Sequence, residues 1–252
     1  MIWNILEKKL LMAIWFQTYN NQFEDDYVFA AYLGFKLISN NIRFFENTSE
    51  ILYNKNDVVV GTIESSRYIF NKLGISVPNL YIPDELSEFT GRKIEKSTIK
   101  DALNRFKNKE KIFIKPVVAK RFPAQVVDGL PLMTYVNQNF DDTMECWISE
   151  VVNFVSEYRI FLNNNEIIGC KHYLGDYKIF LDWNIIETAV KSLKCQPAGW
   201  CLDFGVTDDN KTLLIEANDG YSLGNYGLDT SAYCKLLKDR WIELTSGKCG
   251  IL

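Results

Sequence analysis

The hydrophobic pattern along the chain alternates helical and extended segments. In the N-terminal part, apolar residues at helical spacing surround a compact strand signal at residues 57–61. Residues 65–73 predict a helix that Gly74 closes, and residues 75–78 predict a short strand that enters a turn. This order indicates a small α/β unit at residues 1–78.

Downstream of this unit the pattern favours strands. Residues 96–107 show helical periodicity, and the apolar run 111–116 ends at a proline, which is typical of a strand. A further strand begins at Trp147. Residues 157–162 and 166–173 then predict a β-hairpin, because three asparagines join them and asparagine tolerates left-handed turn geometry.

A second hairpin is predicted nearer the C-terminal end. A helix at residues 184–194 precedes a strand at 200–206, a polar turn at 208–211 and a returning strand at 212–218. A loop punctuated by glycines then runs to Gly227. The pattern shows no internal repeat, so two hairpins and their helices account for this half of the chain.

Composition and charge narrow the possible functions. The chain has 252 residues, 47% hydrophobic and 24% charged, enough to bury a sizeable core in one large or two small domains. Its net charge of −4 argues against nucleic acid as a partner and against attraction to an anionic membrane. No apolar run reaches the roughly 18 residues that span a bilayer, and the run at 10–16 has no signal-peptide cleavage site after it. We expect that run to be buried and the protein to be cytoplasmic.

The six cysteines and the single histidine do not indicate a metal or redox centre. No CxxC pair occurs, which disfavours a zinc site and gives no disulfide framework, so we expect reduced, buried thiols. His172 would have to build a catalytic triad alone, and a structural position in a strand is the simpler expectation.

The second hairpin carries the clearest chemistry. Asp203 lies on one strand, and Glu216 and Asn218 share a face of the other because they are two residues apart. Hard oxygen ligands of this kind suit Mg²⁺, which proteins often share with nucleotide phosphates. The alternative is the solvated face of an ordinary hairpin.

Cations upstream add to this pattern. Lys115 closes an apolar strand, where its ammonium can reach phosphate oxygens as a point charge, and Lys120 and Arg121 follow in the next loop. A solvated basic loop would also explain these residues. Combined with the carboxylates downstream, they supply what phosphoryl transfer requires, which is positioning and charge neutralisation.

In this order the residues resemble the ATP-grasp superfamily. The resemblance covers about residues 111–241, and the steps from Glu150 to Glu157 and from Asp203 to Glu216 match the spacing in D-alanine:D-alanine ligases. The C-terminal part is similar to the bacterial and phage clade named for its two arginines and a lysine. The residues that carry the resemblance are Ile114-Lys115-Pro116, Ser149-Glu150-Val151-Val152, Glu157, Leu202-Asp203-Phe204-Gly205, Ile215-Glu216-Ala217-Asn218-Asp219-Gly220 and Gly224-Asn225-Tyr226-Gly227.

The resemblance implies an α+β fold in which two lobes with antiparallel sheets clasp a nucleotide, after a small α/β N-terminal domain. The implied boundaries are 1–78 for the N-terminal pre-grasp domain and 79–252 for the ATP-grasp domain. The latter would divide into a small lobe at 79–148 and a metal-binding lobe at 149–252.

The resemblance also implies roles for individual residues. Lys115 and Lys120 would contact the ATP phosphates. The backbone of Glu150, Val151 and Val152 would contact adenine, and Glu157 would contact the ribose. Mg²⁺ would be held by Asp203, Glu216 and Asn218. Three catalytic cations would lie near the γ-phosphate or the substrate carboxylate: Lys120, Arg159 and Lys171. Pairing of Arg159 with Glu157 is the alternative.

Two positions depart from the family pattern. Many relatives carry a lysine before the helix that begins here near residue 65, and this chain has Arg67 instead, which either replaces that phosphate contact or leaves it absent. The loop at 117–123 is bulkier and more basic than the usual small-residue loop. We expect phosphate binding to rely more on side chains, and the preference for ATP over GTP stays open.

The implied activity is that of an ATP-dependent carboxylate–amine or carboxylate–thiol ligase that works through an acylphosphate. It needs no protein nucleophile, in agreement with a sequence that lacks a recognisable triad. The acceptor is unknown, with an amino acid or a peptide among the candidates. Two alternatives stay open: a phosphotransferase acting on a hydroxyl or amine, and a nucleotide-binding module without turnover.

Overall fold

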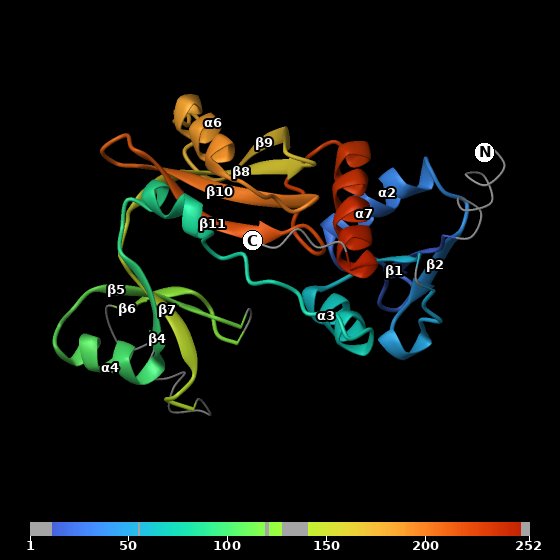
Figure 1. The fold of residues 1–252 in the computed structure, drawn as a ribbon, viewed down its shortest axis with the longest axis horizontal. Coiled ribbons are helices and arrows are strands. Elements are labelled where there is room, and N and C mark those ends of the chain that lie inside the picture. Colours follow the sequence, from blue (N-terminus) through green and yellow to red (C-terminus); the bar gives the residue numbers. More distant parts are fainter. Residues whose placement is uncertain (1–11, 55, 119–120, 128–140, 248–252) are drawn as a thin grey trace. The chain divides into compact units, whose positions relative to one another are not determined.

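The computed structural model describes residues 12–54, 56–118, 121–127 and 141–247 (Figure 1). The chain forms two compact units. One combines Met1–Phe89 with Val155–Leu252, and the other is Thr90–Phe154. No described helix combines the length and apolar character needed to cross a lipid bilayer.

The first unit begins with a small parallel sheet of three strands. Its central strand is β1 (Ile14–Gln17), flanked by β2 (Ile42–Phe45) and β3 (Val58–Val60). The strand residues Ile14 and Phe16 are fully buried, as the apolar run predicted. Short 3₁₀ turns follow at η1 (Thr48–Glu50) and, later, at η2 (Asp84–Thr90).

Three helices surround this small sheet. They are α2 (Asp26–Lys36), α3 (Ile63–Lys72) and, from the far end of the chain, α7 (Thr230–Ser246). Helix α7 packs on α2, on β3 and on β10 of the next sheet, so it ties the two sheets of this unit together (Figure 1). Its Trp241 is buried among the apolar residues of the N-terminal sheet.

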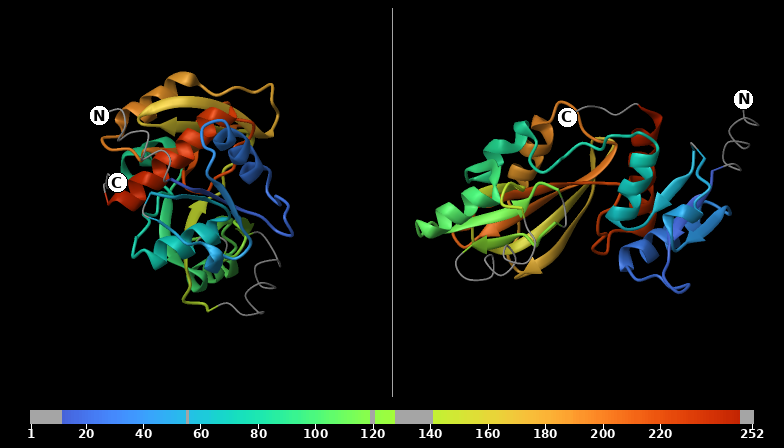
Figure 2. Two further views of the ribbon diagram at one scale, coloured as in Figure 1. Left: turned by 90° about the vertical axis from the view of Figure 1, so that its right-hand side faces the viewer. Right: turned by 90° about the horizontal axis from the view of Figure 1, so that it is seen from below.

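The second sheet of the first unit is antiparallel, with strand order β11-β10-β8-β9. Its strands are β8 (Phe154–Asn163), β9 (Glu166–Gly175), β10 (Gly199–Thr207) and β11 (Thr212–Asp219). Helix α6 (Trp183–Ser192) covers one face, where Leu202 and Phe204 are buried (Figure 2, left). Because side chains alternate along a strand, Cys201 and Asp203 lie on the opposite face.

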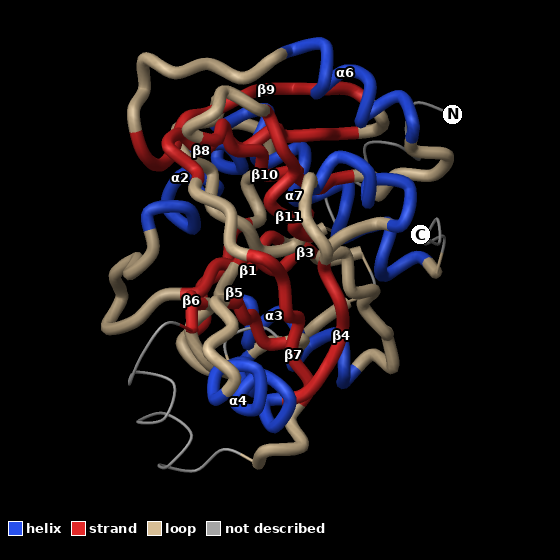
Figure 3. The backbone as a smooth tube through the Cα atoms, turned by 90° about the vertical axis from the view of Figure 1, so that its left-hand side faces the viewer, coloured by secondary structure: helices blue, strands red, loops and turns tan. Residues whose placement is uncertain are grey.

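The second unit has its own antiparallel sheet, with strand order β4-β7-β5-β6. Its strands are β4 (Ile94–Thr98), β5 (Ile112–Pro116), β6 (Gln125–Val127) and β7 (Glu145–Glu150). Helix α4 (Ile99–Lys107) packs along one face of this sheet (Figure 3). Its Ile99 and Ala102 form a core there with Ile112, Ile114 and Ile148.

Both predicted hairpins are confirmed. Asn164 and Asn165 have φ of 50° and 67° at the turn between β8 and β9, the left-handed geometry expected from the asparagines. Asn210 has φ of 61° at the turn between β10 and β11. Gly74 closes α3 with φ of 68°, also as expected.

Two local predictions were wrong. Residues 96–98 close strand β4 instead of opening the helix, because the Thr98 side chain accepts a hydrogen bond from the Asp101 N–H and so caps the helix two residues later. Residues 75–78 are not a strand. The Ile75 N–H bonds back to the Phe70 carbonyl at 2.9 Å, so the segment completes the end of α3 instead of joining a sheet.

The cysteines and the histidine have structural positions. The five described cysteines are free; Cys146, Cys201 and Cys234 are buried, while Cys249 lies outside the described residues. The His172 ring makes an edge-on contact with Tyr158, with ring centroids 5.0 Å apart. Three of the five described cysteines are therefore buried free thiols, and His172 packs against an aromatic ring.

Candidate functional site

The candidate metal ligands meet on one face of the hairpin β10–β11. Asp203 lies opposite Glu216, and Cys201 lies opposite Asn218. The register shifts between Asp203 and Phe204, so a bulge follows the carboxylate pair directly. Bulges of this kind re-aim side chains and are common beside active sites. Strand pairing therefore brings together the three residues that the sequence singled out.

The two carboxylates converge on a single amide. The Asn218 Nδ2 donates to Asp203 Oδ2 and to Glu216 Oε1, both at 3.0 Å. Asp203 is only 2% exposed. Among the described residues no group of three or more histidine, cysteine, aspartate or glutamate side chains is arranged for a metal ion. The two convergent carboxylates nevertheless supply hard oxygen ligands of the kind that Mg²⁺ takes, while Asn218 presents its NH2 group, and not its Oδ1, to both of them.

Arg159 forms an ion pair with the buried Asp203. Its Nε donates to Oδ1 at 2.8 Å and its Nη2 to Oδ2 at 2.7 Å, a bidentate pair, while Nη1 donates to the Gly224 carbonyl at 3.1 Å. Arg159 is 7% exposed, so the pair is buried. The alternative suggested by the sequence, a pair with Glu157, is wrong, because among the described residues Arg159 makes its ion pair with Asp203, and Glu157 accepts the Tyr173 hydroxyl.

Two tyrosines cover this arginine. The Tyr226 ring lies 4.6 Å from the Arg159 guanidinium, and it stacks on Tyr173 with centroids 4.9 Å apart and ring planes at 15°. The Tyr173 hydroxyl donates to Glu157 Oε2 at 2.7 Å. Burial, with the nearby carboxylates of Asp203 and Glu157, raises the pKa of Tyr173 well above its ordinary value. Tyr173 therefore stays neutral and keeps its proton to donate.

Lys171 is a further cation on this face. It pairs in register with Arg159 across β8 and β9. Within the part of the chain that the structure describes, its ammonium makes no hydrogen bond or ion pair, and its side chain is partly buried. Its charge acts on Asp229, whose pKa is lowered by the hydrogen bond from Ser231 and further by this charge.

The remaining predicted residues lie in the second unit or outside the described residues. Lys115 is on β5 opposite Trp147 and alternates with the buried Ile114, so it points away from α4. Glu150 ends β7, and Val151 and Val152 follow it. Lys120 lies outside the described residues, and the structure says nothing of its role.

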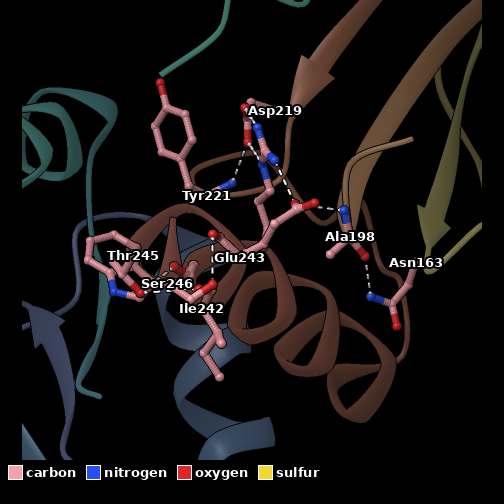
Figure 4. Close-up of polar contacts among 10 residues, drawn as sticks. Asn163, Ala198, Asp219, Tyr221, Ile242, Glu243, Thr245 and Ser246 are labelled. Atoms are coloured by element: carbon pink, nitrogen blue, oxygen red, sulfur yellow. Dashed lines mark hydrogen bonds and ion pairs between the residues drawn. The ribbon is translucent and has the colours of Figure 1, made fainter. Parts of the chain in front are cut away.

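A second buried arginine, which the sequence did not reveal, fixes the end of β11. The guanidinium of Arg240 on α7 donates twice to Asp219, at 2.7 and 2.6 Å, and once to Glu243, at 2.6 Å (Figure 4). Glu243 in turn accepts the Ala198 N–H at 2.8 Å. This network anchors α7 beside the strand that carries two of the candidate ligands. Its only sequence signal was an arginine next to apolar residues near the C-terminal end.

Arg67 does not stand free for phosphate in this structure. Its Nε donates to the Tyr221 hydroxyl at 3.1 Å, which joins α3 to the loop after β11. Ser222 in the same loop contacts the residue that follows β3: its hydroxyl donates to the Gly61 carbonyl at 3.0 Å. Arg67 thus has a structural contact, and it lies inside α3 and not before it.

Comparison with known proteins gives a family and a fold. The family model that matches residues 89–236 is described as an ATP-grasp domain, family 2 of the clade named for two arginines and a lysine. No curated protein matches the chain.

Solved structures with a similar fold cover nearly the whole chain. D-cycloserine synthetase DcsG is 9% identical with a TM-score of 0.56, over 91% of this chain and 99% of that one. The D-alanine–D-alanine ligase from Bacillus anthracis, complexed with ATP, is 13% identical with a TM-score of 0.52, over 94% and 97%. ATP-grasp ligase PsnB, complexed with a minimal precursor, is 12% identical with a TM-score of 0.50, over 92% and 99%. The family resemblance and the fold expected from the sequence are therefore confirmed.

Proposed function

The chain belongs to the ATP-grasp domain family, in family 2 of the clade named for two arginines and a lysine, and we propose that it is an ATP-dependent ligase that joins a carboxylate to an amine or a thiol. The observation that carries the proposal is the convergence of Asp203 and Glu216 on the Asn218 amide nitrogen, at 3.0 Å each. Two carboxylates held at one point, on the face of the sheet opposite α6, favour a cation site over an ordinary hairpin surface.

In the proposed enzyme, Asp203, Glu216 and Asn218 hold Mg²⁺. The ion, when bound, neutralises phosphate charge and so eases transfer of the γ-phosphoryl group. Arg159 keeps the Asp203 carboxylate in one orientation through its bidentate contact. A ligand fixed in this way loses little side-chain freedom when it binds the ion.

The proposed adenine contacts come from backbone groups just after β7. The Glu150 N–H bonds to the Lys93 carbonyl at 3.3 Å, and its carbonyl accepts the Ser149 hydroxyl at 3.0 Å. Among the described residues, the backbone groups of Val151 and Val152 have no such partners. We assign adenine recognition to these two residues, with Glu150 holding the segment in place. Lys115 and Lys120 bind phosphate oxygens, and Glu157 accepts the ribose hydroxyls.

The chemical step needs a cation for the substrate carboxylate. Lys171 is the better candidate, because the Arg159 charge is already neutralised by its buried bidentate pair with Asp203. An oxygen of the bound carboxylate attacks the γ-phosphorus, the bond to the bridging oxygen breaks, and ADP leaves. The amine or thiol then attacks the acyl carbon, and phosphate leaves with the bonding electrons. No protein nucleophile takes part.

The substrate class is supported by what the similar structures are named for. They include a D-alanine–D-alanine ligase, a D-cycloserine synthetase and a ligase complexed with a precursor. We therefore propose an amino acid or peptide as the carboxylate substrate, and an amine as the first nucleophile to test.

Thermal unfolding with and without Mg-ATP tests the nucleotide site. A ligand at about 100 times its dissociation constant stabilises the native state by roughly 2.7 kcal/mol, a shift of several degrees for a chain of this size. We expect that shift in the wild type and its loss in the double variant Glu216→Ala, Asn218→Ala. The matched control, Glu187→Ala with Asn184→Ala on the exposed side of α6, should keep the full shift.

The reaction class is tested by trapping with hydroxylamine, which intercepts an acylphosphate but not a phosphorylated hydroxyl. With amino acids or short peptides as substrate, hydroxamate formation that requires Mg-ATP supports the ligase. Phosphate transfer without any hydroxamate would contradict it and favour a phosphotransferase. Absence of an Mg-ATP shift in the wild type would contradict the nucleotide site itself.

A further inference from the structure

Tyr173 occupies an unusual position in β9. Glu157 pairs with Leu174 and Tyr158 pairs with His172, so Tyr173 is the extra residue of a β-bulge. A bulge re-aims the side chain of its extra residue, and such bulges are frequent beside active sites. Here the re-aimed hydroxyl donates to Glu157 Oε2 at 2.7 Å. The bulge therefore places the Tyr173 hydroxyl where it holds the Glu157 carboxylate in one orientation.

The ring of Tyr173 supports a strained neighbour. Tyr226 has φ of 42°, in the left-handed region that a bulky side chain rarely adopts. It lies in a turn that the Leu228 N–H closes onto the Asn225 carbonyl at 2.7 Å. Stacking on Tyr173 and contact with the Arg159 guanidinium hold the Tyr226 ring in this conformation.

The same contacts reach the metal ligands. The loop that carries Tyr226 also provides the Gly224 carbonyl, which accepts the third hydrogen bond of Arg159 at 3.1 Å. Arg159 holds Asp203 with its other two donors. Tyr173 thus touches Glu157 on one side and, through Tyr226, supports the arginine that orients Asp203 on the other.

We propose that Tyr173 is a positioning residue that joins the ribose end of the site to its metal end, a role that rests on the proposed function. Its hydroxyl orients the Glu157 carboxylate for the ribose hydroxyls. Its ring keeps Tyr226 against Arg159 and so keeps Asp203 in the orientation that binds the ion. The two parts of the side chain have separate effects: Tyr173→Phe removes the hydroxyl alone, and the difference between Tyr173→Leu and Tyr173→Phe gives the effect of the ring.

The hydroxyl is tested with Tyr173→Phe, which keeps the ring. Calorimetric titration of the wild type should show that Mg-ATP binds about tenfold more tightly than Mg-2′-deoxy-ATP, the effect of one hydrogen bond to a charged group. In Tyr173→Phe this preference should fall to about threefold or less, because Glu157 loses the donor that orients it. Tyr177→Phe, which removes the hydroxyl of a tyrosine 67% exposed in the loop after β9, should keep the wild-type preference.

The ring is tested with Tyr173→Leu, which removes the stack. Mn²⁺ is the probe, and its binding in the presence of ADP is followed by the loss of the free-ion electron paramagnetic resonance signal. We expect several-fold weaker Mn²⁺ binding in Tyr173→Leu and wild-type binding in Tyr173→Phe. Tyr226→Leu, which breaks the same stack from the other side, should also weaken Mn²⁺ binding and serves if Tyr173→Leu does not fold.

The outcomes separate the two proposals. If the wild type binds neither Mg-ATP nor Mn²⁺ with ADP, the proposed function fails and the role of Tyr173 fails with it. If the wild type binds both, but Tyr173→Phe keeps the full ribose preference and the leucine variants keep wild-type Mn²⁺ binding, only the role of Tyr173 is overturned.

Discussion

Two buried arginine–aspartate pairs have their aspartates on the same hairpin and differ in what surrounds them. Arg159 holds Asp203 on β10, and Arg240 holds Asp219 at the end of β11, each through two hydrogen bonds of 2.6–2.8 Å. The arginine in the second pair lies between two carboxylates, because it also donates to Glu243. In this network one cation, Arg240, therefore contacts both carboxylates, those of Asp219 and Glu243.

At the first pair the charge is arranged differently. Within the described residues Arg159 contacts Asp203 but not Glu216, and its Nη1 donates to the Gly224 carbonyl. The second carboxylate meets the first through the Asn218 amide. The comparison teaches that a buried ion pair is not by itself a sign of function. What distinguishes the candidate site is a second carboxylate that the same arginine does not contact.

The largest expected effect is on the Arg240 network. Arg240→Met removes the buried counter-charge that Asp219 and Glu243 share, which should cost about 3–5 kcal/mol of unfolding free energy. Chemical denaturation of the variant and the wild type measures this loss. Lys191→Ala, which breaks an exposed pair with Glu187, should cost less than about 0.5 kcal/mol. Equal losses in the two variants would show that burial of the Arg240 network contributes nothing.

The response to Mg²⁺ should separate the two pairs. Arg159→Met also removes a buried counter-charge and should destabilise by about 3 kcal/mol. Because Arg159 orients Asp203 for the proposed ion, Arg159→Met should also lose the stabilisation that millimolar Mg²⁺ gives the wild type, about 1 kcal/mol for a ligand at several times its dissociation constant. Arg240→Met should keep that stabilisation. Equal Mg²⁺ responses of the two variants would contradict a specific cation site at Asp203.

The smallest expected effect serves as the control for both. Asp182 caps α6 on the opposite face of the sheet, where its side chain accepts the Asn184 N–H at 3.0 Å. Asp182→Ala should cost about 1 kcal/mol through loss of the cap. Its response to Mg²⁺ should equal that of the wild type, since neither ion pair is touched. An altered Mg²⁺ response of Asp182→Ala would mean that destabilisation alone changes metal binding. The response of Arg159→Met could then not be assigned to the lost contact with Asp203.

Local patterns in the sequence were sufficient to predict which candidate metal ligands share a face of one hairpin. Asp203, Glu216 and Asn218 could be placed on one hairpin face because side chains on a strand alternate and a polar turn of four residues fixes the pairing. The asparagine turn between β8 and β9 was equally readable, because few residues adopt its left-handed geometry. These predictions depend only on neighbours in the chain.

Contacts between distant residues were not readable. The partner of Arg159 is 44 positions away, and a strand-face pair with Glu157, two positions away, was the natural expectation. Helix α7 was not predicted, although Asp229 caps its start and Gly247 closes its end in left-handed geometry. Its burial against both the N-terminal sheet and β10 leaves little amphipathic signal, so periodicity did not reveal it.

The sequence by itself determined the family, the two hairpins and the set of candidate ligands, because these follow from residue order, spacing and turn chemistry. Only the tertiary structure decided which carboxylates each buried arginine contacts, that Lys171 makes no hydrogen bond or ion pair with a described residue, and that Tyr173 stands between Glu157 and Tyr226. The physical reason is that hydrogen bonds and ion pairs act over about 3 Å. Which groups come that close depends on how the strands and helices pack, and neither spacing nor composition encodes it locally.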